Sequence, residues 1–296
     1  MMSSLSYAAP SSVDEAVKLL AGASGLAKVL SGGTDLLVQM RAGRMKPELI
    51  VDVKKVPGAI GIRKENGAWV IGASTAGAVV EANEDLKKDW PGLVEALDLI
   101  GSTQVQGRCS LAGNLCNASP AADSVPAMYA AGAICVVVGP NGKREVPVEQ
   151  IPAGPGRTNL AKGEFILEIK LPARVPHSGD AYLRFIPRTE MDIAVVGCGV
   201  NVTLDANGVC TAARVSLGAV APTVVLVPDA AAALVGHKLD DATLAALDKA
   251  AQAACKPIND KRGTIEFRTK VAGVLARRTA AIAFDRAAGK TTAKAH

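Results

Sequence analysis

The sequence predicts an α+β chain, with antiparallel strands and helices grouped along its length rather than strictly alternating. Three Asn-Gly pairs, at residues 66–67, 141–142 and 207–208, each lie between strand-like runs. Asn-Gly tolerates the positive φ angles of a tight turn, so each pair predicts a β-hairpin. A strand–helix–strand pattern opens the chain and two long helical patterns close it. At roughly 100–200 residues per domain, the 296 residues predict two domains.

The first helix is expected over residues 12–20, because apolar residues recur there at helical spacing behind the N-cap Ser12. Asp14 and Glu15 stand in its first turn, where acidic side chains complement the helix dipole. The next elements are expected to be a strand, a glycine-containing loop, a helix and a strand, at residues 27–30, 31–35, 36–41 and 49–53. Together they predict a compact β–α–β unit.

The middle of the chain predicts an antiparallel sheet with helices between its hairpins. Strands are expected at residues 59–63 and 68–72, and a helical stretch follows over 73–100, interrupted near Trp90-Pro91. Residues 101–126 are polar or small and are expected to be irregular, since their composition suits neither a helix nor a core strand.

A domain boundary is expected near residues 171–179, where prolines and glycine cluster. The elements expected after it are strands at 181–185, 194–204 and 209–219 and helices at 240–255 and 264–286. The expected organisation is a first domain over 1–176, divided at about residue 57 into the β–α–β unit and the antiparallel sheet, a second domain over 177–289, and a frayed tail over 290–296.

Composition and charge exclude several functions. The net charge of +5 is not concentrated in any basic run, which argues against nucleic acid as the main partner. The six cysteines form no Cys-x-x-Cys pair, so no metal site is expected. This use of cysteine also predicts that the protein is found in a reducing compartment. The three histidines, His177, His237 and His296, fall in expected loops or at the end of the chain, so we expect no catalytic residue among them.

Neither a membrane span nor a familiar nucleotide motif is expected. The longest apolar run, residues 125–138, is shorter than the roughly 20 residues that a span needs and contains Pro126. The N-terminus carries no basic or apolar signal region, so the protein is expected to be cytoplasmic. Gly197-Cys198-Gly199 fails as a dinucleotide fingerprint, because Val202 takes the place of the third glycine and a strand follows.

The first candidate binding loop is Ser31-Gly32-Gly33-Thr34-Asp35, where a strand is expected to turn into a helix. Backbone N–H groups there could hold an anionic pyrophosphate, and glycines would allow close approach. The alternative is an ordinary glycine turn in which Thr34 or Asp35 caps the helix.

The second candidate is the segment from Ser110 to Asp123, which is rich in small, amide and hydroxyl side chains. Such a segment either wraps a polar ligand or is a buried loop that satisfies its own amides. Asp123 could accept hydrogen bonds from ribose or ribityl hydroxyls, as acids do in dinucleotide sites.

Four blocks of this sequence, taken together, resemble the FAD-binding medium subunit of molybdenum hydroxylases, a family that includes aerobic carbon monoxide dehydrogenase and the flavin domain of xanthine dehydrogenase. The blocks are residues 31–37, 110–123, 188–194 and 257–262 with Phe267-Arg268. The resemblance implies a PCMH-type, vanillyl-alcohol-oxidase-like FAD-binding fold followed by a C-terminal sheet-plus-helices domain. Two positions depart from the family pattern: Ala112 replaces a glycine, and Phe267 a frequent tyrosine.

The resemblance also implies roles for individual residues. The loops Ser31, Gly32, Gly33, Thr34, Asp35 and Ser110, Leu111, Ala112, Gly113, Asn114 would hold the FAD pyrophosphate and adenosine. Asp123 would bind a flavin-side hydroxyl, and Arg184 would stand near the isoalloxazine carbonyl edge. Ile100 and Ile166 would lie near the ring system or the adenine, unless they are plain core residues, and Arg184 could instead be a surface residue on its strand.

By the same resemblance, this chain would be an FAD-dependent oxidoreductase subunit in an assembly. A small iron–sulfur subunit and a large molybdopterin subunit would be its partners, in a dimer of heterotrimers, that is a heterohexamer. Substrate oxidation would take place on the large subunit, and the flavin would pass electrons to an external acceptor. Two alternatives stay open: a free-standing flavin-dependent oxidoreductase of the same fold, and a scaffold subunit without flavin.

Overall fold

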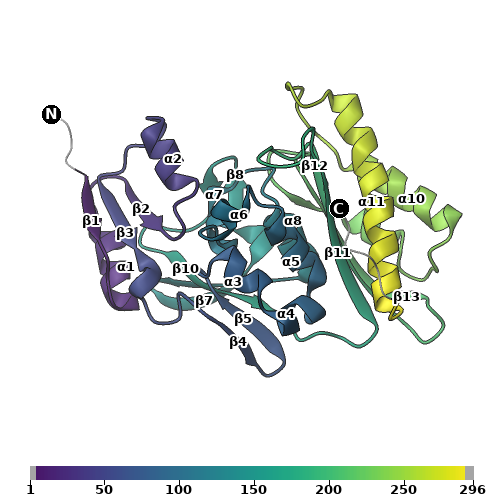
Figure 1. The fold of residues 1–296 in the computed structure, drawn as a ribbon, viewed down its shortest axis with the longest axis horizontal. Coiled ribbons are helices and arrows are strands. Elements are labelled where there is room, and N and C mark those ends of the chain that lie inside the picture. The colour runs from purple at the N-terminus through teal and green to yellow at the C-terminus, as the bar shows by residue number, and fades with distance from the viewer. Residues whose placement is uncertain (1–4, 291–296) are drawn as a thin grey trace.

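The chain opens with the predicted β–α–β unit, at the purple end of Figure 1. The computed structural model describes residues 5–290, so all of the expected tail except Lys290 lies outside it. Strands β1 (Ser6–Ala8), β3 (Leu49–Asp52) and β2 (Ala27–Leu30) form a parallel sheet in that order. Helix α1 (Val13–Gly22) begins after Ser12, whose side chain accepts a hydrogen bond from the Glu15 N–H.

A five-stranded antiparallel sheet follows, and its two outer pairs are the first two predicted hairpins. Its strands, in spatial order, are β4 (Ile62–Glu65), β5 (Ala68–Gly72), β10 (Phe165–Leu171), β6 (Ile134–Gly139) and β7 (Gly142–Pro147). Asn66 and Gly67 have φ angles of 50° and 81°, as the hairpin interpretation requires. A two-stranded sheet, β8 (Pro152–Gly154) with β9 (Arg157–Thr158), lies between β7 and β10 in the chain.

Short helices join these strands, and one expectation fails here. The helical stretch expected over residues 73–100 consists of three helices, α3 (Gly77–Glu81), α4 (Glu84–Asp89) and α5 (Pro91–Asp98). Helix α2 (Leu36–Arg41) and the 3-10 turns Val53–Lys55 and Val148–Gln150 lie elsewhere in the chain. The segment expected to be irregular contains helices α6 (Thr103–Gln106), α7 (Leu111–Asn117) and the start of α8 (Ser124–Ala131).

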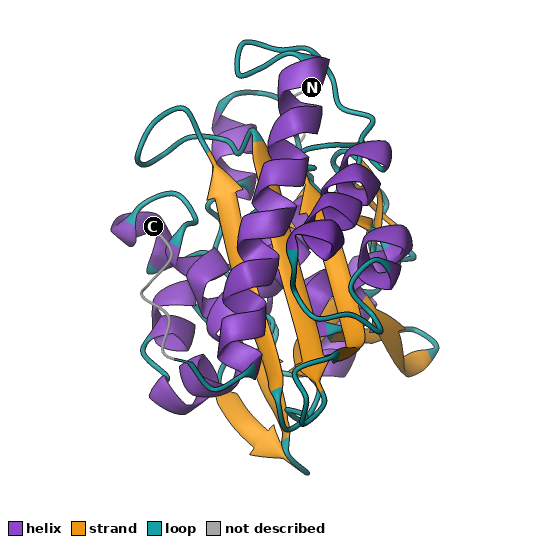
Figure 2. Ribbon diagram, turned by 90° about the vertical axis from the view of Figure 1, so that its right-hand side faces the viewer, coloured by secondary structure: helices purple, strands orange, loops and turns teal. Residues whose placement is uncertain are grey.

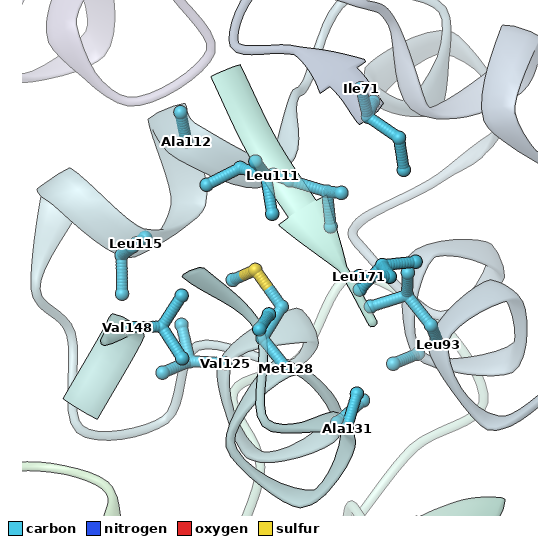
Figure 3. Packing of buried hydrophobic residues seen from close by; sticks show 14 of the residues in the cluster. Ile71, Leu93, Leu111, Ala112, Leu115, Val125, Met128, Ala131, Val148 and Leu171 are labelled. Atoms are coloured by element: carbon cyan, nitrogen blue, oxygen red, sulfur yellow. The ribbon is translucent and has the colours of Figure 1, made fainter. Parts of the chain in front are cut away.

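Helix α7 exists because packing stabilises a sequence with weak helical signals. Ser110 caps its first turn, and Ala118 ends it in the left-handed conformation at φ 50°. Leu111 and Leu115 fall on one helical face and are buried. In the core shown in Figure 3, Leu115 points toward Val125 and Met128 of α8. Short helices depend on such tertiary contacts more than on propensity, which is why composition alone missed this one.

The last part of the chain is a four-stranded antiparallel sheet covered by helices on both faces. Its strands are β11 (Ser178–Phe185), β12 (Val196–Leu204), β13 (Cys210–Gly218) and β14 (Val225–Leu226), followed by helices α9 (Pro228–Ala232), α10 (Asp241–Ala253) and α11 (Ile265–Ala287). Strand β11 begins three residues before the predicted strand, at Ser178. Helix α11 lies across one face (Figure 2), while α5 and α8 pack on the other.

The glycines that fail as a dinucleotide fingerprint have a packing role. A side chain at Gly199 would lie 2.6 Å from the Pro126 carbonyl oxygen of α8, and one at Gly197 would lie 2.7 Å from the Tyr182 hydroxyl. Ser216 on the neighbouring strand donates a hydrogen bond to that Pro126 carbonyl at 2.6 Å. These residues let α8 approach the sheet closely, which fixes the position of Asp123 at the start of α8.

Charged residues also join the C-terminal sheet to α5. Arg286 of α11 donates to both carboxylate oxygens of Glu95 and to the Asp180 carbonyl. The Asp180 carboxylate pairs with Arg174 at 3.0 Å and accepts the Gly92 N–H at 2.9 Å. The two halves of the chain are therefore joined through a buried polar network as well as apolar contacts.

The long apolar run at residues 125–138 is not one segment. It divides into nearly all of α8 and nearly all of β6, separated by Gly132 in the left-handed conformation. Within residues 5–290, no helix is both long and apolar enough to cross a bilayer.

Candidate functional site

The first glycine loop lies against the second candidate segment. The hydroxyls of Ser31 and Ser110 are hydrogen bonded at 2.9 Å, although 79 residues separate them. Lys54, itself paired with Asp52, donates to the Ser31 carbonyl oxygen at 3.0 Å. The structure therefore brings together two loops that the sequence could only treat separately.

The two glycines of the first loop have different roles. A side chain at Gly32 would begin 1.8 Å from the Arg108 carbonyl oxygen. The space beside Gly32 is therefore occupied by protein backbone and is not open to a ligand. Gly33 has a φ of 78°, which favours glycine. Thr34 and Asp35 follow at the start of α2, where the Asp35 side chain is exposed and makes no capping hydrogen bond.

Within the second segment, most polar side chains organise the backbone. Ser110 accepts the Gly113 N–H at 3.2 Å and so caps α7. The Asn114 side-chain oxygen accepts hydrogen bonds from both the N–H and the hydroxyl of Ser124, which tie α7 to α8. Ala112 is a buried helical residue, so the missing glycine causes no strain.

Asp123 and Arg184 form the charged part of the site. The Arg184 guanidinium donates to one Asp123 carboxylate oxygen at 2.9 Å, and the Tyr182 hydroxyl donates to the other at 3.1 Å. Alternation along β11 places Tyr182 and Arg184 on the face that covers α8, so Arg184 is not the surface residue it could have been. Its side chain is only 4% exposed.

Burial raises the pKa of Asp123 to about 6, and Arg184 and Tyr182 act in the opposite direction. An acid of this kind can carry either charge or a proton near neutral pH. The environment that shifts it is the contact between α8 and β11.

Ile100 and Ile166 both belong to the main apolar core, as the alternative interpretation expected. Ile166 pairs with Val137 in the five-stranded sheet, next to an irregularity in the strand register. Gly101, which follows Ile100, accepts a hydrogen bond from the Met191 N–H at 3.4 Å, in the segment between β11 and β12.

Two residues near the loops were missed by the sequence analysis. Lys54 fixes the first loop by its contact with the Ser31 carbonyl oxygen. Ser74 follows Ala73, whose carbonyl lies 3.4 Å from the Ser31 hydroxyl, and its own hydroxyl is buried without a hydrogen-bond partner among the described residues. The Ser74-Thr75 pair, one residue after a buried strand, was the available signal for Ser74.

The two histidines within residues 5–290 take no part in this site. His177 and His237 are exposed, in the turn before β11 and after α9, and His296 lies outside the described residues. Among residues 5–290, no group of acidic, histidine or cysteine side chains could hold a metal ion.

Two family models together match most of the chain. Residues 3–174 match the family model described as the FAD binding domain in molybdopterin dehydrogenase, and residues 181–283 match the CO dehydrogenase flavoprotein C-terminal domain. The chain belongs to this family of flavoprotein subunits.

Similar members of the family cover nearly all of this chain. The carbon monoxide dehydrogenase medium chain of Hydrogenophaga pseudoflava is 34% identical over 95% of this chain and 98% of its own. The putative xanthine dehydrogenase FAD-binding subunit of Escherichia coli K12 is 28% identical over 96% of this chain and 98% of its own.

Solved structures show the same fold. Carbon monoxide dehydrogenase from Hydrogenophaga pseudoflava matches with a TM-score of 0.91 at 34% identity, covering 96% of this chain and 98% of that one. Quinoline 2-oxidoreductase from Pseudomonas putida 86 matches with a TM-score of 0.88 at 26% identity and the same two coverages. The fold inferred from the four sequence blocks is confirmed.

The residues of the two loops and β11 suit an FAD molecule chemically. The Arg184 Nε is buried and has no hydrogen-bond partner among the described residues, although NH1 is bound to Asp123. The Ser74 hydroxyl is likewise buried without a hydrogen-bond partner among the described residues. Buried donors normally have acceptors, and the carbonyl and phosphate oxygens of FAD are acceptors of the required kind.

Proposed function

We propose that this chain binds FAD where the loops at residues 31–35 and 110–114 meet, and passes electrons from the iron–sulfur clusters of a partner subunit to an external acceptor. The observation that carries this proposal is the junction of the two loops through Ser31 and Ser110, together with the buried pair of Asp123 and Arg184. The hydrogen bonds between Ser124 and Asn114 join the segments that carry them. Membership of a flavoprotein family, whose models match residues 3–174 and 181–283, supports the proposal.

In this proposal the backbone of the two loops receives the pyrophosphate and adenosine. Lys54 holds the first loop in place through the Ser31 carbonyl, while Asp52 pairs with the Lys54 charge. Ser110 and Asn114 hold the second segment through capping and helix-to-helix hydrogen bonds. Such residues keep the N–H groups preorganised, so little entropy is lost when the anion binds.

Asp123 and Arg184 serve the flavin end. When bound, FAD takes up electrons singly and releases them in pairs, which is the chemistry that the protein itself lacks. The Arg184 cation stabilises negative charge on the carbonyl edge of the ring, and Asp123 both holds Arg184 and accepts a flavin-side hydroxyl. Ile100 and Ile166 belong to the main apolar core and are given no cofactor contact in this proposal.

The proposed assembly places the remaining chemistry on other chains. A small iron–sulfur subunit supplies electrons, and a large molybdopterin subunit oxidises the substrate, in a cytoplasmic dimer of heterotrimers. Relatives described as a medium chain and an FAD-binding subunit support this arrangement. We further propose residues 1–176 and 177–289 as its two domains.

Titration of the flavin-free chain with FAD tests the proposal. We expect quenching of flavin fluorescence at a saturating ratio, and a Kd at least tenfold higher for Arg184→Gln, which loses the charge beside the ring. Arg277→Gln is the control, because Arg277 is an exposed residue of α11 that pairs with Asp248 of α10. This substitution should leave the Kd unchanged. A wild-type chain that stays colourless after reconstitution would remove the flavin function and leave the scaffold alternative.

Purification of the chain from cells, together with the proteins bound to it, decides between a subunit and a free-standing enzyme. We expect co-purification with iron- and molybdenum-containing chains, and no oxidation of organic donors by the chain alone. Turnover of a small organic donor by a stable monomer free of both metals would contradict the subunit proposal.

A further inference from the structure

Arg268, near the start of α11, is a buried cation far in sequence from both loops. It is 3% exposed, and its guanidinium reaches three acceptors on three different segments. One nitrogen donates to the Val195 carbonyl at 2.7 Å and the Ala219 carbonyl at 3.3 Å, and the other donates to Asp260 at 2.6 Å. Burying a charge is costly unless it is paired, so this arrangement needs all of its partners.

The Val195 contact fixes one end of the segment 186–195, which connects β11 to β12. Val195 closes this segment, since its N–H donates to the Phe185 carbonyl at 2.8 Å directly beside Arg184. Phe267 adds an apolar contact, with its ring centroid 5.9 Å from that of Phe185. Arg268 and its neighbour therefore hold the end of the strand that carries Arg184.

The contact of Arg268 with Ala219 fixes the segment that precedes Asp123, the partner of Arg184. Ala219 lies just after β13 in the left-handed conformation, with φ at 62°. Its N–H donates to the Pro120 carbonyl at 2.7 Å, only three residues before Asp123. A single guanidinium thus connects the segment before Asp123 with the segment after Arg184.

Acidic residues complete the arrangement. Asp260 also accepts the Arg262 N–H at 2.8 Å, and the Arg262 side chain lies 3.5 Å from Asp192. Asp192 in turn accepts the Ile193 N–H at 2.8 Å within the segment 186–195. Arginine suits this position because its planar fork can donate to several fixed acceptors at once, whereas lysine cannot match them all.

We propose that Arg268, together with Asp260, is a positioning residue that holds the segments 119–123 and 186–195 in register, so that Asp123 and Arg184 meet at the flavin end of the site. This rests on the proposed FAD function for its consequence, while the positioning itself is a property of the protein alone. It gives the fourth sequence block, which contains no proposed cofactor contact, a role in the site.

The first measurement is hydrogen exchange of the flavin-free chain carrying Arg268→Met, Arg268→Lys or Asp260→Asn. We expect exchange in both segments to rise at least tenfold in Arg268→Met, and less in Arg268→Lys, while the strands of the five-stranded sheet keep their protection. Asp260→Asn keeps the shape of a side chain that is 27% exposed, so it covers the case in which Arg268→Met fails to fold. Arg278→Met, an exposed change on the same helix, is the control. Unchanged exchange in both segments of a folded variant would overturn the proposal.

The second measurement is the FAD Kd and the visible circular dichroism of bound flavin in the same variants. We expect a Kd at least tenfold higher and an altered flavin spectrum in Arg268→Met or Asp260→Asn, with partial recovery in Arg268→Lys. Lower thermal stability with an unchanged Kd and spectrum would reduce Arg268 to a structural role and overturn the proposal. A wild-type chain that binds no FAD would instead refute the proposed function, and the exchange measurement would still decide whether the two segments are held by Arg268.

Discussion

Gly32 and Gly33 are neighbours in the chain, yet their missing side chains matter for different reasons. At Gly32 the space is taken by the backbone of Arg108, two residues before the second segment, so a larger residue would push the two loops apart. At Gly33 the constraint is the backbone conformation, with leucine side chains only 3.0 to 3.1 Å from where a side chain would begin. Sequence patterns predict the same residue for both situations.

Gly33→Val is expected to release FAD from the chain. Valine is β-branched and is strained at positive φ, at a cost of about 1–3 kcal/mol, and its methyl groups would move the loop backbone. Flavin occupancy after purification and urea unfolding measure the two effects. Gly208→Val is the matched control, since Gly208 has a φ of 77° with open space around it on a distant hairpin. Full flavin occupancy in Gly33→Val would show that the first loop is not part of the cradle.

At the scale of elements, α7 shows how a short helix can carry a site. Its N-cap Ser110 accepts a backbone N–H and also hydrogen bonds to Ser31, so the same hydroxyl begins the helix and joins the loops. The helix has only seven residues and depends on its buried leucines for stability. Local structure and loop-to-loop geometry are therefore coupled through one side chain.

Ser110→Ala is expected to lower the free energy of unfolding by about 1 kcal/mol, the usual value of an N-cap, and to raise the FAD Kd. Chemical denaturation and flavin titration measure the two changes. Ser12→Ala, which removes the N-cap of α1, should cost similar stability without changing the Kd. Equal FAD affinities in the two variants would indicate that the Ser31–Ser110 contact does not position the cradle.

At the scale of the whole molecule, the C-terminal sheet is an integral part of the first half of the chain. On one face of β11, Tyr182 and Arg184 donate hydrogen bonds to Asp123. On the same face, Asp180 accepts a hydrogen bond from the N–H of Gly92 on α5. The other face packs on α11. The alternating directions of side chains on one strand thus join the core of the second half to the site in the first.

Asp180 is expected to make stability depend on pH in an unusual direction. Burial raises its pKa to about 6, with Arg174 and Arg286 opposing that effect and Glu95 adding to it. Between about pH 4 and pH 6 the folded chain holds a proton on Asp180 that the unfolded chain releases, so this group's contribution to stability increases as the pH falls. Acids with a lowered pKa, such as Asp52, have the opposite dependence.

Comparison with Asp180→Asn isolates this effect from the other acids. The difference in unfolding free energy, wild type minus variant, is expected to become more positive as the pH falls from 6.5 to 4, as measured by urea unfolding at fixed ionic strength. A difference that is constant or shrinks over this range would contradict the burial of a titrating Asp180.

Much of the architecture could be predicted from local signals. Turn chemistry at Asn66-Gly67 and the cap at Ser12 act within a few residues, so the hairpins and the first helix were predictable. The irregular structure expected for residues 101–126 was wrong, because α6, α7 and α8 are stabilised by packing that a window of sequence does not contain. The early start of β11 has the same origin, since Ser178 and Gly179 pair with β12.

By itself, the sequence determined the fold class, the two glycine-bearing segments and the family, because these depend on short patterns in a fixed order. Only the tertiary structure decided that Ser31 meets Ser110, that Asp123 is paired with a buried Arg184, and that Arg268 reaches both of their segments. These contacts join residues tens of positions apart, and their geometry depends on how α8 and α11 pack on the two faces of one sheet. Burial then raises the pKa of Asp123, an effect that no local pattern can specify.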